Sequence, residues 1–156
     1  MNPPRRVITG LDAQGRSGFL VDGPSNMVIW STDDSPANNS EAADAGGGVF
    51  RFPTSGTLFA FSDFAPGQVS PMHATDTIDY IVVVFGEVVF VTETAETLLH
   101  AGDVLVDRGI MHAWRNESEE PCRILIVLCP ARPVGSGATV SGEVGSGELR
   151  QIPKMA

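Results

Sequence analysis

Two of the three histidines in this sequence, His73 and His112, lie in stretches of similar character. Each stretch combines strand-forming residues with punctuating glycines: PGQVSPMHATDTIDYIVVVFGEVVF at 66–90 and AGDVLVDRGIMHAWRN at 101–116. Such stretches predict two hairpins that deliver two imidazoles to one interior site. Imidazole nitrogens bind metal ions and also exchange protons near neutral pH, so this pair is the strongest functional signal in the chain.

Strand geometry adds a carboxylate to the pair. Side chains two residues apart share a face, so His73, Thr75 and Asp79 project the same way if their strand has no bulge. An aspartate and hydroxyls on an inward face predict a polar cavity. On the second stretch, His112 and Trp114 share a face, and Trp114 is either a wall of that cavity or ordinary core packing.

Both stretches resemble the paired signature motifs of the cupin superfamily. The first motif is usually G-x5-H-x-H-x3-4-E-x6-G, and the second is usually G-x5-P-x-G-x2-H-x3-N. The matching positions are Gly67, His73, Thr75, Asp79 and Gly86 in the first motif, and Gly102, Gly109, His112 and Asn116 in the second. The second motif is one residue shorter here and has Asp107 where proline is usual. The resemblance covers 67–116 and implies an all-β fold, an antiparallel double-sheet β-barrel of the jelly-roll type.

Two departures from the motifs define what the site could bind. Thr75 replaces the second histidine and Asp79 replaces the usual glutamate, so the resemblance implies a metal site of His73, Asp79 and His112. Two imidazoles and one carboxylate suit one divalent ion of iron, zinc or manganese. Without metal, Asp79 and a histidine can form an acid–base pair. The competing interpretations are hydrogen-bonded core histidines, a salt bridge between Asp79 and Arg51, and an ordinary strand threonine at position 75.

The resemblance implies a small-molecule enzyme. We expect Asp79, His73 and His112 to be catalytic and the substrate pocket to be lined by Thr75, Trp114, Phe50, Phe52, Phe59 and Phe61. Aromatic walls favour an aromatic or polyketide-like metabolite. Small cupins often act in secondary metabolism, and the prediction is metal-assisted lyase or isomerase chemistry: dehydration, decarboxylation or proton transfer. The alternatives are a non-haem iron dioxygenase and a non-catalytic ligand-binding cupin, which the loss of the second motif histidine favours.

Composition limits the partners of the chain. It has 156 residues, 42% of them hydrophobic, which suits one packed domain. A formal net charge of −9 with ten scattered basic residues argues against nucleic acid and anionic membranes. No signal peptide is recognised, because no apolar run follows the charged N-terminus, and no segment approaches membrane-spanning length. We therefore expect a cytoplasmic protein in which Cys122 and Cys129 are free thiols.

Short strand-like runs alternate with turn residues along the chain, which predicts an antiparallel sandwich or barrel independently of the resemblance. The expected strands are 19–21, 27–30, 49–52, 58–61, 69–73, 79–85, 88–91, 97–99, 104–106, 111–115 and 123–128. We expect a single domain over 1–132, with a surface loop at 31–48 and a flexible Gly/Ser-rich tail at 133–156. Unpaired sheet edges are a liability that dimerisation covers, so we also expect a homodimer that uses N-terminal strands.

Overall fold

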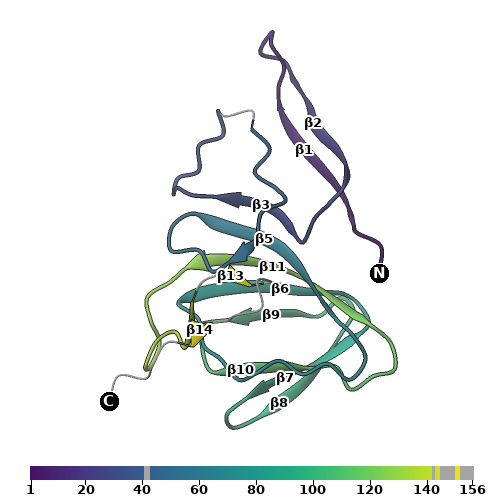
Figure 1. Ribbon diagram of the computed structural model, residues 1–156, viewed down its shortest axis with the longest axis vertical. Helices are drawn as coiled ribbons and strands as arrows, with labels where there is room; N and C mark the ends of the chain where they lie inside the picture. Colours follow the sequence, from purple (N-terminus) through teal and green to yellow (C-terminus); the bar gives the residue numbers. More distant parts are fainter. Residues whose placement is uncertain (41–42, 142, 145–149, 152–156) are drawn as a thin grey trace.

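The computed structural model describes residues 1–40, 43–141, 143–144 and 150–151 of the chain. These residues form strands joined by turns (Figure 1). The strands are β1 (Arg5–Leu11), β2 (Ser17–Pro24), β3 (Val28–Thr32), β4 (Phe50–Arg51), β5 (Thr57–Phe64), β6 (Thr77–Phe85), β7 (Glu87–Thr92), β8 (Glu96–His100), β9 (Val104–Asp107), β10 (His112–Arg115), β11 (Cys122–Pro130), β12 (Val140–Ser141), β13 (Glu143–Val144) and β14 (Arg150–Gln151). The predicted all-β class is confirmed. The described part of the chain has no helix that could cross a membrane.

Two antiparallel sheets form the body of the molecule. The larger has the order β3-β5-β11-β6-β9 and the smaller has the order β10-β7-β8. In Figure 1 the smaller sheet lies below the larger one. One core cluster draws on both sheets: Ile81 of β6 and Ile124 of β11 belong to the same cluster as Phe90 of β7 and Trp114 of β10. The two sheets therefore pack face to face.

The period-two alternation of a strand decides which side chains enter this core. Along β6, Ile81 and Val83 are 4% and 1% exposed, whereas Tyr80 and Val84 are 50% and 44% exposed. Asp79 has the same parity as Ile81 and is also buried. The apolar run of β6 thus has an inner face that carries a carboxylate and an outer face that stays apolar in solvent.

One expected strand is not a strand in the structure. Residues 69–73 form only two single bridges, Val69 with Arg115 and His73 with His112. Pro71 lies between them and has no N–H to donate, so a continuous ladder is interrupted there. Strand β1 was not expected, because most of its side chains are exposed and its apolar alternation is weak.

The predicted surface loop at 31–48 begins inside β3 and is anchored in the structure. Arg6, which is largely buried, donates to both carboxylate oxygens of Asp44 at 2.7 and 2.6 Å. Arg6 also donates to the carbonyl of Ile29 at 3.1 Å. This ion pair holds the loop beside the base of the β1–β2 hairpin.

The tail at 133–156 was predicted to be flexible, and part of it lies outside the described residues. Its described part is docked on the body. The N–H of Ala74 donates to Thr139 Oγ1 at 2.8 Å, and the N–H of Thr139 donates to the carbonyl of Ala74 at 2.9 Å. In addition, β13 pairs with β4 and β12 pairs with β14. The first part of the tail therefore lies against the segment that carries His73.

Replacing Leu128 by alanine is expected to lower the free energy of unfolding by about 2–5 kcal/mol, because this side chain is fully buried on the central strand β11. Leu98→Ala is the matched control, since Leu98 is 45% exposed on β8, and a change of at most about 0.5 kcal/mol is expected. Urea unfolding monitored by tryptophan fluorescence measures both. Equal losses for the two variants would contradict the core assignment.

Candidate functional site

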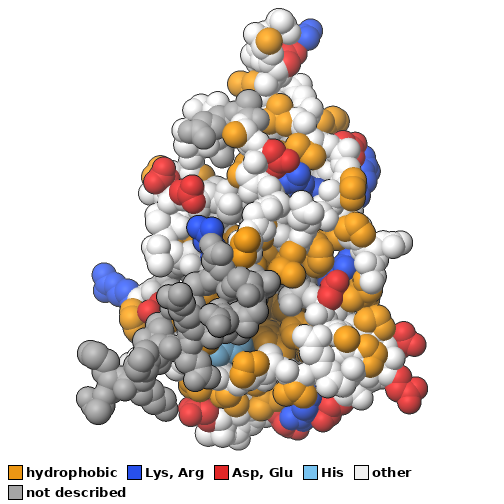
Figure 2. All heavy atoms as spheres, viewed as in Figure 1, with side chains coloured by type: hydrophobic (Ala, Val, Ile, Leu, Met, Phe, Trp, Pro, Cys, Tyr) orange, Lys and Arg blue, Asp and Glu red, His pale blue; other side chains and the backbone are white. Residues whose placement is uncertain are grey.

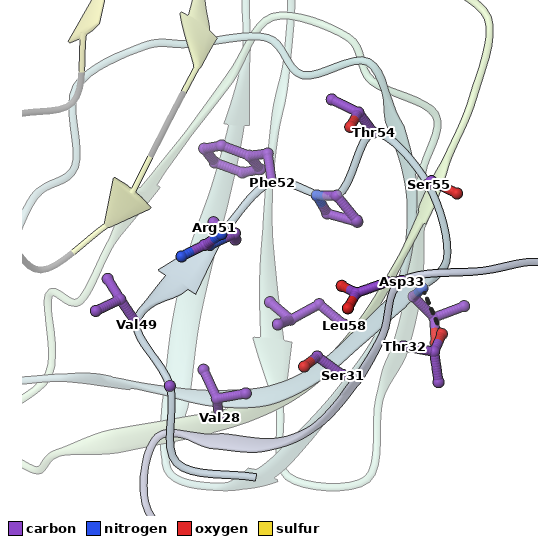
Figure 3. A pocket seen from close by; sticks show the side chains of 13 residues that line it. Val28, Ser31, Thr32, Asp33, Val49, Arg51, Phe52, Thr54, Ser55 and Leu58 are labelled. Atoms are coloured by element: carbon purple, nitrogen blue, oxygen red, sulfur yellow. Dashed lines mark hydrogen bonds between the residues drawn. The ribbon is translucent and has the colours of Figure 1, made fainter. Parts of the chain in front are cut away.

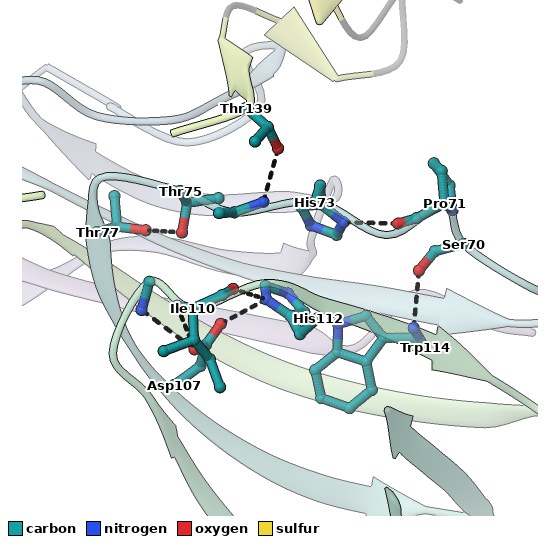
Figure 4. A network of polar contacts seen from close by, with 12 residues as sticks. Ser70, Pro71, His73, Thr75, Thr77, Asp107, Ile110, His112, Trp114 and Thr139 are labelled. Atoms are coloured by element: carbon teal, nitrogen blue, oxygen red, sulfur yellow. Dashed lines mark hydrogen bonds and ion pairs between the residues drawn. The ribbon is translucent and has the colours of Figure 1, made fainter. Parts of the chain in front are cut away.

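His73 and His112 meet through their backbones as well as their rings. The N–H of each residue donates to the carbonyl of the other, both at 2.8 Å, in an antiparallel bridge. The two ring centroids are 4.3 Å apart and the rings are tilted by 53°. Figure 4 shows the two imidazoles next to each other, one on the segment before β6 and the other at the start of β10. The two imidazoles therefore lie side by side, as the sequence analysis predicted.

In each histidine, a contact with the backbone carbonyl two residues earlier fixes the tautomer of the imidazole. His73 Nδ1 lies 2.8 Å from the carbonyl oxygen of Pro71, and His112 Nδ1 lies 2.9 Å from that of Ile110. A carbonyl oxygen can only accept, so Nδ1 carries the proton in each ring. The neutral form of either histidine therefore keeps its lone pair on Nε2. Each ring presents the same atom for accepting a proton or binding an ion.

Asp107 is a buried partner of His112 that the sequence analysis did not place in the site. Its Oδ2 lies 2.9 Å from His112 Nδ1, and its Oδ1 accepts from the N–H groups of Gly109 and Ile110 at 3.1 and 3.3 Å. The Nδ1 proton is shared with the Ile110 carbonyl, and Asp107 Oδ2 has no well-aligned hydrogen bond, so the contact is chiefly ionic. The sequence offered one clue to this role, because Asp107 stands where the cupin motif usually has proline. On β9 its side chain points to the interior of the protein.

The two histidines have pKa values shifted in opposite directions. Burial lowers the pKa of His73, and the neighbouring charge of His112 lowers it further, against smaller opposing effects of the Pro71 carbonyl and Asp107. Burial alone would also lower the pKa of His112, but the close contact with the Asp107 carboxylate and its negative charge raise it, helped by the Ile110 carbonyl and Asp79. The pair therefore combines an imidazole that gives up its proton more readily than a free histidine with one that holds its proton more strongly.

Asp79 is buried on the inner face of β6, directly opposite Asp107 on β9. Burial raises its pKa to about 6; the Asp107 charge acts in the same direction, whereas Thr77 and His112 oppose it. Its Oδ1 atom has no hydrogen-bond partner. Two carboxylates on adjacent strands thus share one face of the sheet beside His112.

Thr75 is buried, and its hydroxyl accepts a hydrogen bond from Thr77 Oγ1 at 2.9 Å. The carbonyl of Thr75 lies under Gly109, whose φ is +77°. A Cβ at position 109 would stand 2.4 Å from that carbonyl oxygen, so the turn between β9 and β10 needs a glycine to approach this closely. The close approach brings Asp107 and His112 against the segment that carries His73.

Aromatic rings surround His112. Phe90 stacks on it with centroids 5.2 Å apart, and Trp114 meets it edge-on at 6.2 Å. Trp114 also contacts Phe90 at 4.9 Å and Phe64 at 5.7 Å, so it is both a core residue and a neighbour of the imidazole. In the space-filling view, a histidine surface lies beside a hollow bordered by hydrophobic side chains (Figure 2). Phe90 was missed, although it pairs directly with Trp114 across β7 and β10.

The four phenylalanines expected around the site lie elsewhere. Phe50 and Phe52 pack edge-on at 5.8 Å in a second core cluster. Phe52 also lines a cavity of about 410 Å³, to which Arg51 and Leu58 contribute as well (Figure 3).

Phe59 lies on the outer face of β5, opposite in parity to the buried Leu58 and Ala60, and Phe61 shares the parity of Phe59 but is buried. The guanidinium of Arg123 covers the Phe61 ring, with its Cζ 4.4 Å from the centroid. Phe59 borders a groove on the outer face together with Tyr80. The ring contacts found for His73 and His112 in the described chain are with each other, Phe90 and Trp114, so a substrate pocket lined by Phe59 and Phe61 stays a prediction.

The residues of the site do not form a three-ligand metal centre as folded. Among the side chains described, no three or more His, Cys, Asp or Glu lie close enough together to hold one ion. The two Nε2 atoms have the right chemistry for ion binding, but the Asp107 contact goes to Nδ1, on the other side of the His112 ring. His100, expected to be exposed, is exposed beside Asp103 and Glu87.

Comparison with known proteins identifies the family. A family model described as a cupin domain matches residues 60–128. The chain is 31% identical to Phomopsin biosynthesis cluster protein D of Diaporthe leptostromiformis, over 94% of this chain and 89% of that protein. It is 30% identical to the cupin-domain-containing oxidoreductase srdD of Neurospora crassa, over 90% of this chain and 83% of that protein. The crystal structure of a Cupin 2 conserved barrel domain protein from Salinispora arenicola has 25% identity and a TM-score of 0.45, covering 48% of this chain and 64% of that one. The chain belongs to the cupin family.

Asp107→Asn is expected to lower the pKa of His112, because it removes the negative charge that holds the imidazolium proton. NMR titration of the His112 Cε1–H resonance measures this. Asp103→Asn is the control, since Asp103 lies 3.7 Å from the exposed His100 and is not among the groups that shift His112. A His112 titration that Asp107→Asn leaves unmoved would contradict the ion pair.

Asp79→Asn is expected to change how stability depends on pH. The folded pKa of about 6 lies above the ordinary value of 3.8, so the carboxyl favours the folded state below pH 3.8 and loses this advantage as pH rises through about 6. The full shift corresponds to up to about 3 kcal/mol, and the asparagine variant should show a flatter profile over that range and greater stability near pH 8. Urea unfolding between pH 4 and 8 tests this, with the exposed Asp34→Asn as control. An unchanged profile in Asp79→Asn would be the contrary result.

Proposed function

We propose that this chain is a cupin enzyme of secondary metabolism that transfers protons in a dehydration or isomerisation of an aromatic or polyketide-like metabolite. One observation carries the proposal: two adjacent imidazoles have the same tautomer but opposite pKa shifts. Pairs of titratable groups whose surroundings push their pKa values apart are characteristic of acid–base catalysis. In this proposal the two sheets are the walls of a double-sheet barrel around the substrate.

His73 is the general base. Its lowered pKa keeps it neutral near pH 7, and its Nε2 lone pair can take a proton from a carbon next to a carbonyl group. His112 is the general acid. Its Nε2–H can protonate a departing hydroxyl group, which leaves as water when the carbon–carbon double bond forms.

The same two groups serve an isomerisation if the proton returns to another carbon. In either reaction, exchange with solvent restores the starting protonation states. Asp107 is a positioning residue, because it contacts Nδ1 of His112 and not the substrate side of the ring.

The surroundings of His112 support the substrate class. Phe90 and Trp114 offer aromatic faces and edges, to which a flat, conjugated ligand can pack. Among the residues that the structure describes, no arginine or lysine shifts the pKa values of His73, Asp79 and His112. A site with buried carboxylates and without such a cation favours a neutral carbonyl compound over a phosphorylated one.

An oxygenase is the second candidate, because the Neurospora crassa relative is named an oxidoreductase. That chemistry, like the metal-assisted form of the lyase, would need a divalent ion, which His73 and His112 would hold, and elemental analysis of tag-free protein tests it. A third candidate is a ligand-binding protein without catalysis, and the experiments described below distinguish it from the two enzymes. The cytoplasm stays the expected compartment.

Deuterium exchange tests the proposal without knowledge of the natural substrate. Aromatic ketones with acidic neighbouring C–H bonds are incubated in D2O with the protein, and mass spectrometry follows the gain of deuterium. Wild-type protein is expected to speed this exchange, and His73→Ala should slow it by about 100-fold or more, as expected on removing a general base. His100→Ala is the control and should exchange like wild type.

The other candidates give different results in the same set of experiments. Oxygen consumption that depends on added Fe(II), without deuterium exchange, would establish the oxygenase instead. Saturable binding of the ketones with neither exchange nor oxygen consumption would establish the ligand-binding protein. Exchange that survives in both His73→Ala and His112→Ala would remove the acid–base assignment.

A further inference from the structure

The segment that carries His73 is bound along both of its edges. In an extended chain the backbone groups of successive residues point to opposite edges, so those of His73 face one edge and those of Ala74 face the other. The His73 groups bind His112. The N–H of Ala74 donates to Thr139 Oγ1 at 2.8 Å, and the Ala74 carbonyl accepts from the N–H of Thr139 at 2.9 Å. The segment therefore lies between β10 and a part of the chain that follows β11.

Residues 131–140, which we call the strap, have a second anchor at Asp76. The backbone carbonyl of Asp76 accepts from the N–H of Ala131 at 2.8 Å, and its Oδ1 accepts from the N–H of Ala138, also at 2.8 Å. One residue thus ties down both ends of the turn between Ala131 and Ala138. Val140, at the end of the strap, is 5% exposed, which fixes that end in the interior.

The turn inside the strap fits closely against Asp76. The N–H of Gly137 donates to the carbonyl of Val134 at 3.0 Å, and the φ of Gly137 is +74°. A Cβ at position 137 would lie 3.2 Å from Pro133 Cβ and 3.4 Å from Asp76 Oδ1. The turn therefore needs glycine at this position, in a stretch whose composition alone predicted a flexible tail.

The His73 segment needs such an anchor because its contact with β10 is an isolated bridge. Pro71 interrupts the ladder before His73, and β6 begins only at Thr77. A segment held by one bridge can tilt about it, and a second fixed point on the opposite edge prevents the tilt. Figure 4 shows Thr139 on the opposite side of the segment from His112, bound to the backbone between His73 and Thr75.

We propose that Thr139 and Asp76 are positioning residues, through which the strap fixes the imidazole of His73 against that of His112. The consequence for activity rests on the proposed proton transfer, because a general base works only where its lone pair meets the proton that leaves. The hydroxyl of Thr139 is the decisive group. Ala74 is 3% exposed, so a side chain without an acceptor at position 139 would leave a buried N–H unpaired.

Thr139→Val tests the proposal, because valine has nearly the shape of threonine but cannot accept a hydrogen bond. The informative amide is that of His73, whose hydrogen bond goes to His112 and is not itself removed. Its hydrogen exchange should become at least about tenfold faster, since the bridge opens more often once the opposite edge is released. The Cε1–H resonance of His73 should shift as the ring moves relative to His112. Thr139→Ser keeps the hydroxyl and should restore both signals.

The deuterium-exchange assay measures the consequence for catalysis. Thr139→Val should lower kcat about 10- to 100-fold, as expected when a catalytic group is displaced. KM should stay within about twofold of wild type, because the strap acts on the base and not on the binding of the ketone. Asp76→Ala, which releases the other anchor, should move the amide, resonance and kcat readouts in the same direction by a smaller factor.

Thr32→Val is the matched control for Thr139→Val. Thr32 Oγ1 also accepts a backbone N–H, from Thr57 at 2.9 Å, but it lies on β3. Asp103→Ala is the control for Asp76→Ala, since Asp103 Oδ2 accepts from the N–H of His100 at 2.8 Å. Both controls should leave the His73 signals and kcat as in wild type. Far-UV circular dichroism verifies folding, and Asp76→Ala decides the matter if Thr139→Val does not fold.

Unchanged amide exchange and an unchanged resonance of His73 in Thr139→Val would overturn the proposal at any level of activity. So would a displaced imidazole with an unchanged kcat, or equal effects in Thr32→Val, which would reduce the strap to a general contribution to stability. A wild-type protein that exchanges no deuterium into the ketones would instead remove the proposed function. The two NMR measurements would then decide by themselves whether the strap positions His73.

Discussion

The reciprocal pair of backbone hydrogen bonds between His73 and His112 is the interaction on which the site depends. It joins two segments that lie far apart in the chain, and it does so at the two residues whose side chains carry the chemistry. Because a hydrogen-bonded antiparallel pair holds its two side chains on the same face, the rings have to meet. Pro71, two residues before His73, interrupts the ladder, so the bridge is a single contact and not part of a long strand pair. Its formation relies on Gly109, where the turn passes over the carbonyl of Thr75.

This arrangement places charge where the fold would otherwise place apolar side chains. Asp79 and Asp107 lie opposite each other on the inner face of a sheet whose other inner residues are largely aliphatic. Burial of a carboxylate is unfavourable unless it is paired, and only Asp107 has an imidazole and backbone N–H groups around it. Asp79 instead shifts its pKa toward neutrality. Unfavourable burial of this sort, concentrated beside two imidazoles, is common at functional sites and uncommon elsewhere in a fold.

The strands that build the site also build a different surface on their other side. On β6, Asp79 faces the interior and Tyr80 faces outward, and on β9 Asp107 and Val106 divide in the same way. Alternation along a strand makes this division unavoidable. The inner face holds its carboxylates beside imidazoles and hydroxyls, although Asp79 Oδ1 has no hydrogen-bond partner, whereas the outer face is apolar although it lies in solvent. Buried polar groups and exposed apolar side chains therefore occupy opposite sides of a single layer.

The amino-acid sequence by itself determined the all-β class, the two histidine segments, and the shared parity of His73 and Asp79, because these follow from local residue types and the two-residue period of a strand. It did not determine which carboxylate would contact His112. That choice fell to Asp107, through a turn whose tightness depends on the backbone of Thr75, a contact between segments distant in the chain. Parity also could not tell inward from outward on β5, where Leu58 and Ala60 are buried and Phe59 lies on the opposite face. Only the pairing of β5 with β11, which fixes both strands in one layer of the core, decided which of their faces would be buried.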